Sequence, residues 1–332
     1  MTQAHSHPHA HPHTGQPHGH THHADLDWAT EGPRLVREAE VYQPLTEQVI
    51  TWLHERLAAT GTRPDAVRRV LDIGSGAGIV TCLLTEAFPR AEVVAVDAAQ
   101  PLLDLTADRA ARHGVGDRVS TLLADLPDGV ARGANGDAAT TDPAPATDAA
   151  GRPVVAGIGE ADVIWSRKVL HHVGDQRDVV NRLARALRPG GLIALTEGGL
   201  PSRFLPRDLG FGRPGLQARL NVATEERFEG MRAGLPGATR EREDWAGMLA
   251  GAGLREATSR GFLLDLPAPL GQDGRAYLAS VLSRFTEHAP ELVDAADHAT
   301  LAKLLDPTDP ESLAQRADVF LLTAETVHTA YA

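Results

Sequence analysis

Residues 70–80 read Val70-Leu71-Asp72-Ile73-Gly74-Ser75-Gly76-Ala77-Gly78-Ile79-Val80, an apolar run, three alternating glycines and the start of a helical pattern. The apolar run predicts a buried strand, and the spacing after the glycines predicts a helix. Glycine allows a tight turn between the two elements and lets a ligand lie against the backbone. The first turn of the helix directs free N–H groups and its positive dipole end at that ligand. The stretch therefore predicts a loop that holds a pyrophosphate or an amino-acid carboxylate.

The glycine spacing separates two kinds of nucleotide site. Dinucleotide-binding loops follow the pattern G-x-G-x-x-G. The third glycine would be residue 79 when counted from Gly74 and residue 81 when counted from Gly76, but the chain has Ile79 and Thr81 there. The pattern present is D-x-G-x-G-x-G. An NAD-dependent oxidoreductase on a Rossmann fold is therefore the alternative rather than the first choice among enzymes.

On both sides of this loop, apolar runs alternate with helical patterns. The predicted strands are Val70–Ile73, Glu92–Val96, Val119–Leu123, Asp162–Trp165 and Leu192–Thr196. The predicted helices between them are Ala77–Phe88, Pro101–His113 and 176–187, the last with Asp175 as its N-cap and Pro189-Gly190-Gly191 as its stop. Outside this core, helical patterns cover 33–59 (divided at Pro44), 241–252 and 272–305, and β-rich runs cover 257–266 and 318–326. This order predicts an α/β fold with a parallel sheet.

Acidic residues close the second and third predicted strands. Asp97 lies nineteen residues after Gly78, and Asp125 follows the third strand. The carboxyl ends of parallel strands form the edge at which open α/β folds bind ligands, and a carboxylate after the second strand can accept ribose hydroxyls there. Both acids are therefore candidate binding residues.

Five segments in this order resemble the motifs of the class I S-adenosylmethionine-dependent methyltransferases. They are the glycine stretch (motif I), Val93–Asp97, Leu122–Leu126, Ala161–Ser166 (motif IV) and Leu187–Gly191. The resemblance covers residues 65–197. It implies a Rossmann-like, seven-stranded, mostly parallel sheet with helices on both faces, and S-adenosyl-L-methionine as the cofactor.

The resemblance also implies which residues contact the cofactor. The methionine half would lie against the glycine loop, and the nucleoside would lie along the ends of the second and third strands. The implied contacts are Gly74, Gly76 and Gly78 with the methionine half, Asp72 and the Ser166 carbonyl with its ammonium group, Asp97 with the ribose, and Asp125 and Leu126 with the adenine.

Side chains after the fourth predicted strand are the candidates for a catalytic base. Methyl transfer from a sulfonium is an in-line displacement, so the protein aligns the acceptor and removes a proton from an oxygen or nitrogen. Of Arg167, Lys168, His171 and His172, the two histidines suit that role because imidazole is a base near neutral pH. The alternative is that one imidazole only caps or packs. No metal site is predicted. No third ligand lies at a spacing typical of a metal site, and a strand-like His171–His172 pair would point to opposite sides.

The segment after the fourth strand and the charge balance bear on the acceptor. DNA amino-methyltransferases resemble one another in an Asn/Asp-Pro-Pro-Tyr/Phe signature, whereas this chain has Trp165-Ser166-Arg167-Lys168. A net charge of −12 also disfavours nucleic acid. The pattern is similar to small-molecule methyltransferases of quinone and secondary-metabolite pathways, with O-, N- and C-methylation left open. In this interpretation 198–240 and 267–316 form a lid, and an apolar pocket is lined by Phe204, Phe211, Trp245 and Phe285.

The rest of the chain is divided by composition. Residues 1–24 hold nine of the sixteen histidines and little apolar area, which predicts a disordered tail, with metal binding by that tail as an alternative function. Residues 25–62 are predicted as a helical segment, either a lid or a homodimer contact, and 63–332 as the methyltransferase domain with a flexible insert at 131–160. One cysteine, Cys82, and no apolar run near ~20 residues are typical of a cytoplasmic protein without a membrane span.

Overall fold

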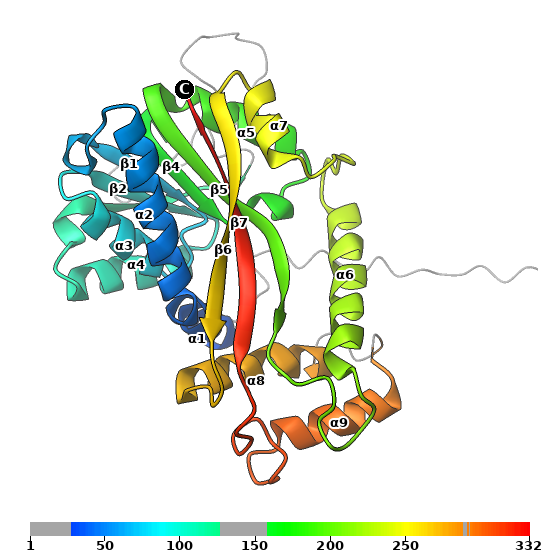
Figure 1. Ribbon diagram of the computed structural model, residues 1–332. Coiled ribbons are helices and arrows are strands. Elements are labelled where there is room, and N and C mark those ends of the chain that lie inside the picture. Colours follow the sequence, from blue (N-terminus) through cyan, green and yellow to red (C-terminus); the bar gives the residue numbers. More distant parts are fainter. Residues whose placement is uncertain (1–27, 127–157, 288–290, 292) are drawn as a thin grey trace, which may run out of the picture.

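Strand β1 (Arg69–Ile73) is an interior strand of a seven-stranded sheet in the computed structural model, which describes residues 28–126, 158–287, 291 and 293–332 (Figure 1). The other strands are β2 (Glu92–Asp97), β3 (Val119–Leu123), β4 (Ala161–Arg167), β5 (Leu187–Arg203), β6 (Arg255–Leu266) and β7 (Leu321–Tyr331). The strand order is β3-β2-β1-β4-β5-β7-β6. Strands β1 to β5 pair in parallel, and β7 runs antiparallel to both β5 and β6. The predicted Rossmann-like, mostly parallel sheet is confirmed.

Helices cover both faces of this sheet. In chain order they are α1 (Trp28–Val41), α2 (Gln43–Ala59), α3 (Ile79–Ala87), α4 (Gln100–Arg112), α5 (Gln176–Arg185), α6 (Leu216–Gly234), α7 (Trp245–Gly251), α8 (Gln272–Glu287) and α9 (Ala295–Leu305). Successive residues of a strand point to opposite faces. Val70 packs in one apolar cluster with α2 and α3, and Leu71 packs in a second cluster with α5 and α7. Both faces of β1 are therefore buried, which explains its uninterrupted apolar run.

Local signals set where the helices begin. The first helical stretch divides before Pro44, as predicted, and the proline occupies the first turn of α2. Helix α3 begins at Ile79 rather than at the predicted Ala77, because Gly78 has a left-handed φ of +78° and is the N-cap. The Asp175 side chain caps α5, as predicted. Capping and turn chemistry near each helix start thus determine these boundaries.

Strand β5 is much longer than predicted. The expected strand was Leu192–Thr196, but the strand runs over Leu187–Arg203. The residues Pro189-Gly190-Gly191 form an irregular step inside the strand rather than a stop before it. Ala161 of β4 pairs with Leu187, and after the step Val163 pairs with Leu192. The far end of β5 continues beyond β4 because β7 supplies its hydrogen bonds there.

The C-terminal third extends the sheet and covers its free end. Strand β7 occupies Leu321–Tyr331, where 318–326 was expected, because its second half pairs between β5 and β6. The helical stretch expected over 272–305 is two helices, α8 and α9. In Figure 1 both helices lie below the long strands, and α6 stands beside β5. Residues 198–203 of the predicted lid therefore belong to the sheet instead.

Two predicted segments fall largely outside the described residues. These are the histidine-rich tail at 1–24 and most of the insert at 131–160. The boundary between a helical segment and a catalytic domain at residue 62 stays a prediction, although Leu53 and Val70 pack in one cluster across it. Among the residues that the structure describes, no helix has both the length and the apolar character needed to cross a bilayer.

Candidate active site

All three glycines of the loop after β1 have left-handed backbone, with φ of +70° at Gly74, +55° at Gly76 and +78° at Gly78. Two of them are closely packed. A Cβ on Gly74 would lie 2.1 Å from Cγ2 of Val169, and one on Gly78 would lie 2.7 Å from Cα of Thr106. A Cβ on Gly76 would meet no atom within 4 Å. The backbone at Gly76 therefore borders open space, as expected of a loop that receives a ligand.

Asp97, the last residue of β2, ties this loop to the start of α4. Its Oδ2 accepts the N–H of Gly76 at 2.9 Å, and its Oδ1 accepts the N–H of Ala99 at 3.0 Å. A carboxylate has further lone pairs beyond these two bonds. The carboxylate is thus held rigidly beside the glycine loop, at the end of β2.

Asp125 and Leu126 follow the end of β3. The residue before them, Ala124, donates its N–H to the carbonyl of Asp97 at 2.9 Å. Asp125 is exposed and Leu126 is half-buried. The chain therefore leaves β3 directly beside Asp97. This is the edge of the sheet at which the sequence predicted nucleoside binding.

Asp72 lies beneath the loop and is almost fully buried. Burial raises the pKa of Asp72 to about 7. The hydrogen bond from Oγ1 of Thr81, at 2.6 Å, opposes this rise, and the negative charge of Asp97 adds to it. A cation placed next to Asp72 would favour its carboxylate form and would lower its pKa again.

Two buried hydroxyl groups near the loop lack partners. Among the described residues, Oγ of Ser75 and Oγ of Ser166 have no hydrogen bond. Ser166 is paired in register with Ile73, so it lies next to the start of the loop. Buried polar groups are normally hydrogen-bonded. With the open space at Gly76, these hydroxyls fit a polar ligand lying across the ends of β1 and β4.

His171 is held by a buried carboxylate. It lies in the 3₁₀ turn η4 (Leu170–His172), and its Nδ1 is 2.8 Å from Oε2 of Glu197 in β5. The other oxygen, Oε1, accepts the N–H groups of Val169 at 2.9 Å and of Leu170 at 2.7 Å. When Nδ1 carries the proton that Glu197 accepts, Nε2 of the neutral ring is a free acceptor. In that tautomer, Nε2 of His171 points away from Glu197 and can accept a proton.

His172 has a different environment from His171. The two rings lie 4.2 Å apart because the residues form a 3₁₀ turn, so the expectation of a strand-like pair pointing to opposite sides was wrong. His172 is exposed. The ring of His171 also contacts that of Phe228 in α6 at 5.6 Å, and Arg232 of the same helix donates to the carbonyl of His171 at 2.9 Å. Helix α6 therefore holds the turn that carries His171.

Arg167 and Lys168 belong to an ion-pair network and not to a free base site. Arg167 binds Glu325 of β7 through two hydrogen bonds of 2.9 and 2.6 Å, and Nζ of Lys168 lies 2.9 Å from the same carboxylate. Both cations lie over the ring of Tyr42, at 4.9 and 4.6 Å from its centroid. Burial opposes ionisation of Glu325, but Lys168 and Arg167 outweigh it and lower its pKa to about 2.

The four aromatic residues predicted to line one pocket lie on both faces of the sheet. Phe204, Phe211 and Phe285 pack in the cluster that contains α8 and α9. Trp245 packs on the opposite face, in the cluster that contains α5. The four side chains therefore do not line a common pocket.

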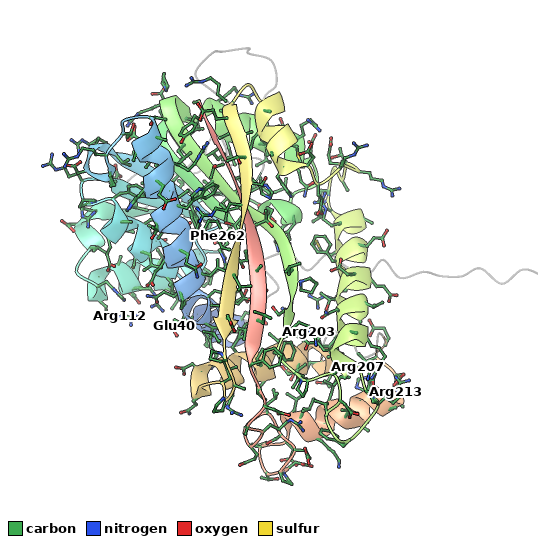
Figure 2. All side chains as sticks on the ribbon, viewed as in Figure 1. Glu40, Arg112, Arg203, Arg207, Arg213 and Phe262 are labelled. Carbon is green, nitrogen blue, oxygen red and sulfur yellow. The ribbon has the colours of Figure 1, made fainter. Side chains whose placement is uncertain are left out.

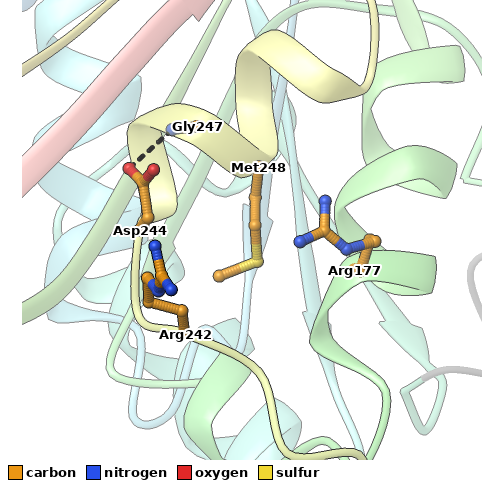
Figure 3. A pocket seen from close by; sticks show the side chains of 5 residues that line it. All are labelled: Arg177, Arg242, Asp244, Gly247 and Met248. Carbon is orange, nitrogen blue, oxygen red and sulfur yellow. Dashed lines mark hydrogen bonds between the residues drawn. The ribbon is translucent and has the colours of Figure 1, made fainter.

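Two of the charged side chains that line a hollow of about 270 Å³ beside α5 and α7 are already paired. Figure 3 shows the side chains that line it, which are Arg177, Arg242, Asp244, Gly247 and Met248. Arg177 is paired with Glu241 at 2.9 Å, and Asp244 caps α7 by accepting the N–H of Gly247. These groups stabilise the junction of two helices, and the predicted site residues lie elsewhere.

The fold and the loop together define a class of protein, and sequence comparison supplies the family. A parallel sheet with a glycine loop after β1 and an acid at the end of β2 is a Rossmann-like nucleotide-binding sheet. The sequence model of a family described as a methyltransferase domain matches residues 45–254, more than half of the chain, and the chain belongs to that family. The chain thus carries the methyltransferase domain that its motifs predicted.

Individual relatives match over shorter parts. The chain is 36% identical over 83 residues to a release factor glutamine methyltransferase from Chlorobaculum tepidum, covering 25% of this chain and 28% of that protein. It is 31% identical over 150 residues to a 27-O-demethylrifamycin SV methyltransferase from Amycolatopsis mediterranei, covering 45% of each. The chain thus spans less than half the length of these relatives. An O-methyltransferase family protein from Burkholderia thailandensis, a solved structure, is 19% identical, with 68% of this chain and 55% of that chain covered and a TM-score of 0.41.

Alanine at two of the glycines is expected to cause different losses. Gly76→Ala places its Cβ in open space, so the fold loses only about 1–2 kcal/mol for left-handed alanine, but the methyl group occupies space where the cofactor is expected to bind. We expect binding of S-adenosylhomocysteine to weaken about tenfold or more. Gly78→Ala forces the backbone of α4 to move, because its Cβ would lie too close to Thr106, and should therefore lower the free energy of unfolding more than Gly76→Ala does. Calorimetric titration and urea unfolding of both variants measure this, and wild-type cofactor affinity in Gly76→Ala would contradict it.

Proposed function

We propose that the protein transfers the methyl group of S-adenosyl-L-methionine to an oxygen or nitrogen atom of a small-molecule acceptor, with His171 as the general base. The pairing of His171 with Glu197 carries the proposal, because it directs a free imidazole nitrogen away from a buried carboxylate beside the end of β4. The cofactor, when bound, supplies a methyl group already activated on a sulfonium. The chain's own residues bind the two molecules, align them and remove a proton.

The residues around the glycine loop are assigned to the cofactor. Open space at Gly76 and the unpaired hydroxyls of Ser75 and Ser166 support a polar ligand here. The place of the Asp97 carboxylate supports ribose binding, since backbone N–H groups of Gly76 and Ala99 fix it at the end of β2 beside the glycine loop. The proposed contacts are Gly74, Gly76 and Gly78 with the methionine half, Asp72 and Ser166 with its ammonium group, Asp97 with the ribose, and Asp125 and Leu126 with the adenine.

The proton follows one route in this proposal. Nε2 of His171 takes the proton of the acceptor as the oxygen or nitrogen forms its bond to the methyl carbon. Nδ1 keeps its own proton and donates it to Glu197. The buried carboxylate of Glu197 stabilises the positive charge of the imidazolium and holds the ring in one orientation. His172 is exposed, and the proposal assigns it no role in proton transfer.

A small-molecule acceptor is supported by charge and by one relative. A net charge of −12 does not favour binding of a nucleic acid. The relative from Amycolatopsis mediterranei is named for a small acceptor and matches over 150 residues, against 83 for the glutamine methyltransferase.

We test the acceptor class with S-adenosylmethionine that carries a deuterated methyl group, incubated with phenols, with amines and with a protein extract. Label in small molecules, read by mass spectrometry, is the expected result, and label confined to proteins would overturn this assignment.

Asp97→Ala is expected to weaken binding of S-adenosylhomocysteine by about 100-fold. The change removes a charged acceptor for the ribose, and such hydrogen bonds are each worth about 1.5–3 kcal/mol. It also frees the N–H groups of Gly76 and Ala99, so the loop loses its fixed shape. Asp104→Ala is the control, because Asp104 is exposed on α4 and accepts a hydrogen bond from the neighbouring Gln100 side chain. Equal affinities of the two variants in calorimetric titration would remove the ribose assignment.

The pKa of Asp72 predicts how cofactor binding depends on pH. Because burial raises this pKa to about 7, the cofactor-free protein is protonated at Asp72 in mildly acidic solution. An ammonium group beside Asp72 requires the carboxylate, so affinity should fall by up to about tenfold for each pH unit below about 7. Asp72→Asn should bind more weakly above that pH and show no such slope. A pH series of titrations with S-adenosylhomocysteine checks this, and an unchanged slope in the variant would contradict it.

The same shift has a consequence for the stability of the cofactor-free fold. The folded pKa of Asp72 lies above the ordinary aspartate value of 3.8, so over this range the folded state holds a proton that the unfolded chain has already lost. Stability therefore falls as pH rises from about 4 to about 7. Asp72→Asn should remove this part of the pH dependence in urea unfolding.

A further inference from the structure

His328 in β7 is a buried histidine that forms hydrogen bonds at both ring nitrogens. Its Nδ1 lies 2.7 Å from Oγ of Ser259 in β6, and its Nε2 lies 3.1 Å from the carbonyl oxygen of Glu197 in β5. The three strands lie side by side in Figure 1, and Figure 2 shows their side chains as sticks. The ring of His328 therefore joins β6 to the residue whose carboxylate holds His171.

The surroundings of His328 select one form of its ring. A carbonyl oxygen only accepts hydrogen bonds, so Nε2 donates its proton to Glu197, and Nδ1 accepts the proton of the Ser259 hydroxyl. Burial lowers the pKa of His328, although the carbonyl and the negative charge of Glu197 oppose this, and the ring is neutral. The ring of Trp245 packs beside it, with the two centroids 6.4 Å apart. His328 is thus a fixed donor aimed at the backbone of Glu197.

Glu197 lies at an irregular point of β5, where strand pairing holds its backbone less firmly. The pairing of β5 with β7 shifts register between Thr196 and Gly199. Such a bulge takes a residue out of the regular ladder and changes the direction of a side chain. The next two residues are Gly198 and Gly199, with φ of +72° and +134°, and glycine is the most flexible residue in the backbone. The hydrogen bond from His328 therefore fixes a segment that its own sequence leaves flexible.

The position of Glu197 determines the orientation of His171. The carboxylate of Glu197 accepts the N–H groups of Val169 and Leu170 at 2.9 and 2.7 Å, and it lies 2.8 Å from Nδ1 of His171. All three contacts are made to one short turn and are within the narrow range of good hydrogen bonds. A displacement of the Glu197 backbone would therefore loosen the whole set and release the imidazole ring.

We propose that His328 is a positioning residue for the proposed base. It fixes the Glu197 carbonyl, and through it the carboxylate that orients His171, while Ser259 holds the His328 ring in the tautomer that donates to Glu197. The alternative is that His328 only satisfies polar groups in the core, in which case its loss lowers stability without a change at His171. This inference rests on the proposed function, since methyl transfer responds to His328 only where His171 removes the proton.

Two changes at His328 in the full chain test the proposal. His328→Leu removes the donor to Glu197, whereas His328→Gln keeps an N–H that can reach the carbonyl. We expect His328→Leu to lower kcat by about 10–100-fold with the KM of the cofactor within a few-fold of wild type, because small misplacements of reacting groups have effects of this size. The ¹⁵N resonances of the His171 ring should show a mixture of tautomers in place of the one protonated at Nδ1. His328→Gln should restore most of the rate and of the tautomer.

Val327→Ala is the matched control, because it removes buried methyl groups from the neighbouring residue of β7 and keeps the donor to Glu197. It should lower stability in urea unfolding and leave the His171 tautomer as in wild type. A wild-type tautomer in His328→Leu would overturn the proposal, and so would an equal change in Val327→Ala. Ser259→Ala carries the same test if His328→Leu does not fold, since it removes only the bond at Nδ1, and an unchanged His171 tautomer in that variant would again overturn the proposal.

The tautomer is read without turnover, so the two failures are distinguishable. A His171 tautomer that changes in His328→Leu while kcat stays at the wild-type value would confirm the positioning contact and overturn the proposed function of His171 as base.

Discussion

Changing His171 to glutamine is expected to slow methyl transfer by a factor of about 10²–10⁴, which is the usual contribution of a general base. Binding of S-adenosylhomocysteine should stay within a few-fold of wild type, because His171 contacts Glu197 and α6 rather than the glycine loop. The measurement is single-turnover transfer to an acceptor found by the deuterated-methyl screen. The matched control is His172→Gln, which changes an exposed neighbour and should keep most of the rate. Equal rates for the two variants would remove His171 from the mechanism.

Glu197→Gln separates positioning from general damage to the site. The amide keeps one oxygen to accept the N–H groups of Val169 and Leu170, but it presents an N–H to Nδ1 of His171. The imidazole must then accept at Nδ1 and carry its proton on Nε2, which removes the base. We expect kcat to fall with the KM of the cofactor nearly unchanged, and ¹⁵N resonances of the His171 ring to show the switched tautomer. A variant that retains the wild-type tautomer would contradict the positioning role.

The sequence could predict those features of the site that depend on residues close together in the chain. The loop after β1 is contiguous in sequence, and its alternating glycines adopt the left-handed backbone that their residue type allows. Asp97 was found because it ends a predicted strand. Glu197 stands in the same relation to the predicted fifth strand, directly after Thr196, so the rule that identified Asp97 would have identified Glu197 as well.

Other features depend on pairing between distant segments, which local pattern does not reveal. Nothing near Glu325 singles it out in the sequence, because its partner Arg167 comes from β4 and meets it only across the assembled sheet. The length of β5 was also missed. Its last residues do not alternate between apolar and polar side chains, so they carry no strand pattern, and they form a strand because β7 supplies their hydrogen bonds. Trp245 was placed in a pocket with three phenylalanines because composition does not tell which face of the sheet a helix covers.

The network at Glu325 links this non-local structure to the site. Arg167 directly follows Ser166, and Lys168, which has a left-handed φ of +55°, begins the turn toward His171. Lys168 keeps this conformation while its N–H bonds to the carbonyl of Thr196 and its ammonium group binds Glu325. A residue with strained backbone, such as Lys168 beside the turn that carries His171, is stable only where surrounding contacts fix it. Glu325 is therefore expected to support both the fold and the orientation of the turn.

Glu325→Gln is accordingly expected to lower the free energy of unfolding by about 3–5 kcal/mol, as removal of one partner from a buried ion pair does. Arg167 would keep its buried charge without a counter-ion, and Lys168 would lose its contact at 2.9 Å. The loss should be greatest above about pH 4.5 and should shrink as pH falls toward about 2, because the pKa of Glu325 is lowered to about 2 in the folded state and wild type loses the contribution there. Guanidinium unfolding at several pH values measures both effects.

A double variant distinguishes the stranded charge from the lost contact. Arg167→Met with Glu325→Met removes both charges of the bidentate pair and fills similar volume with apolar atoms, which is often close to neutral for stability. It should therefore be more stable than Glu325→Gln alone, although it carries two changes. If the double variant were the less stable one, the hydrogen-bond geometry of the pair rather than the uncompensated charge of Arg167 would stabilise this junction. The turn that carries His171 would then depend on the pair itself, and no apolar replacement would preserve methyl transfer.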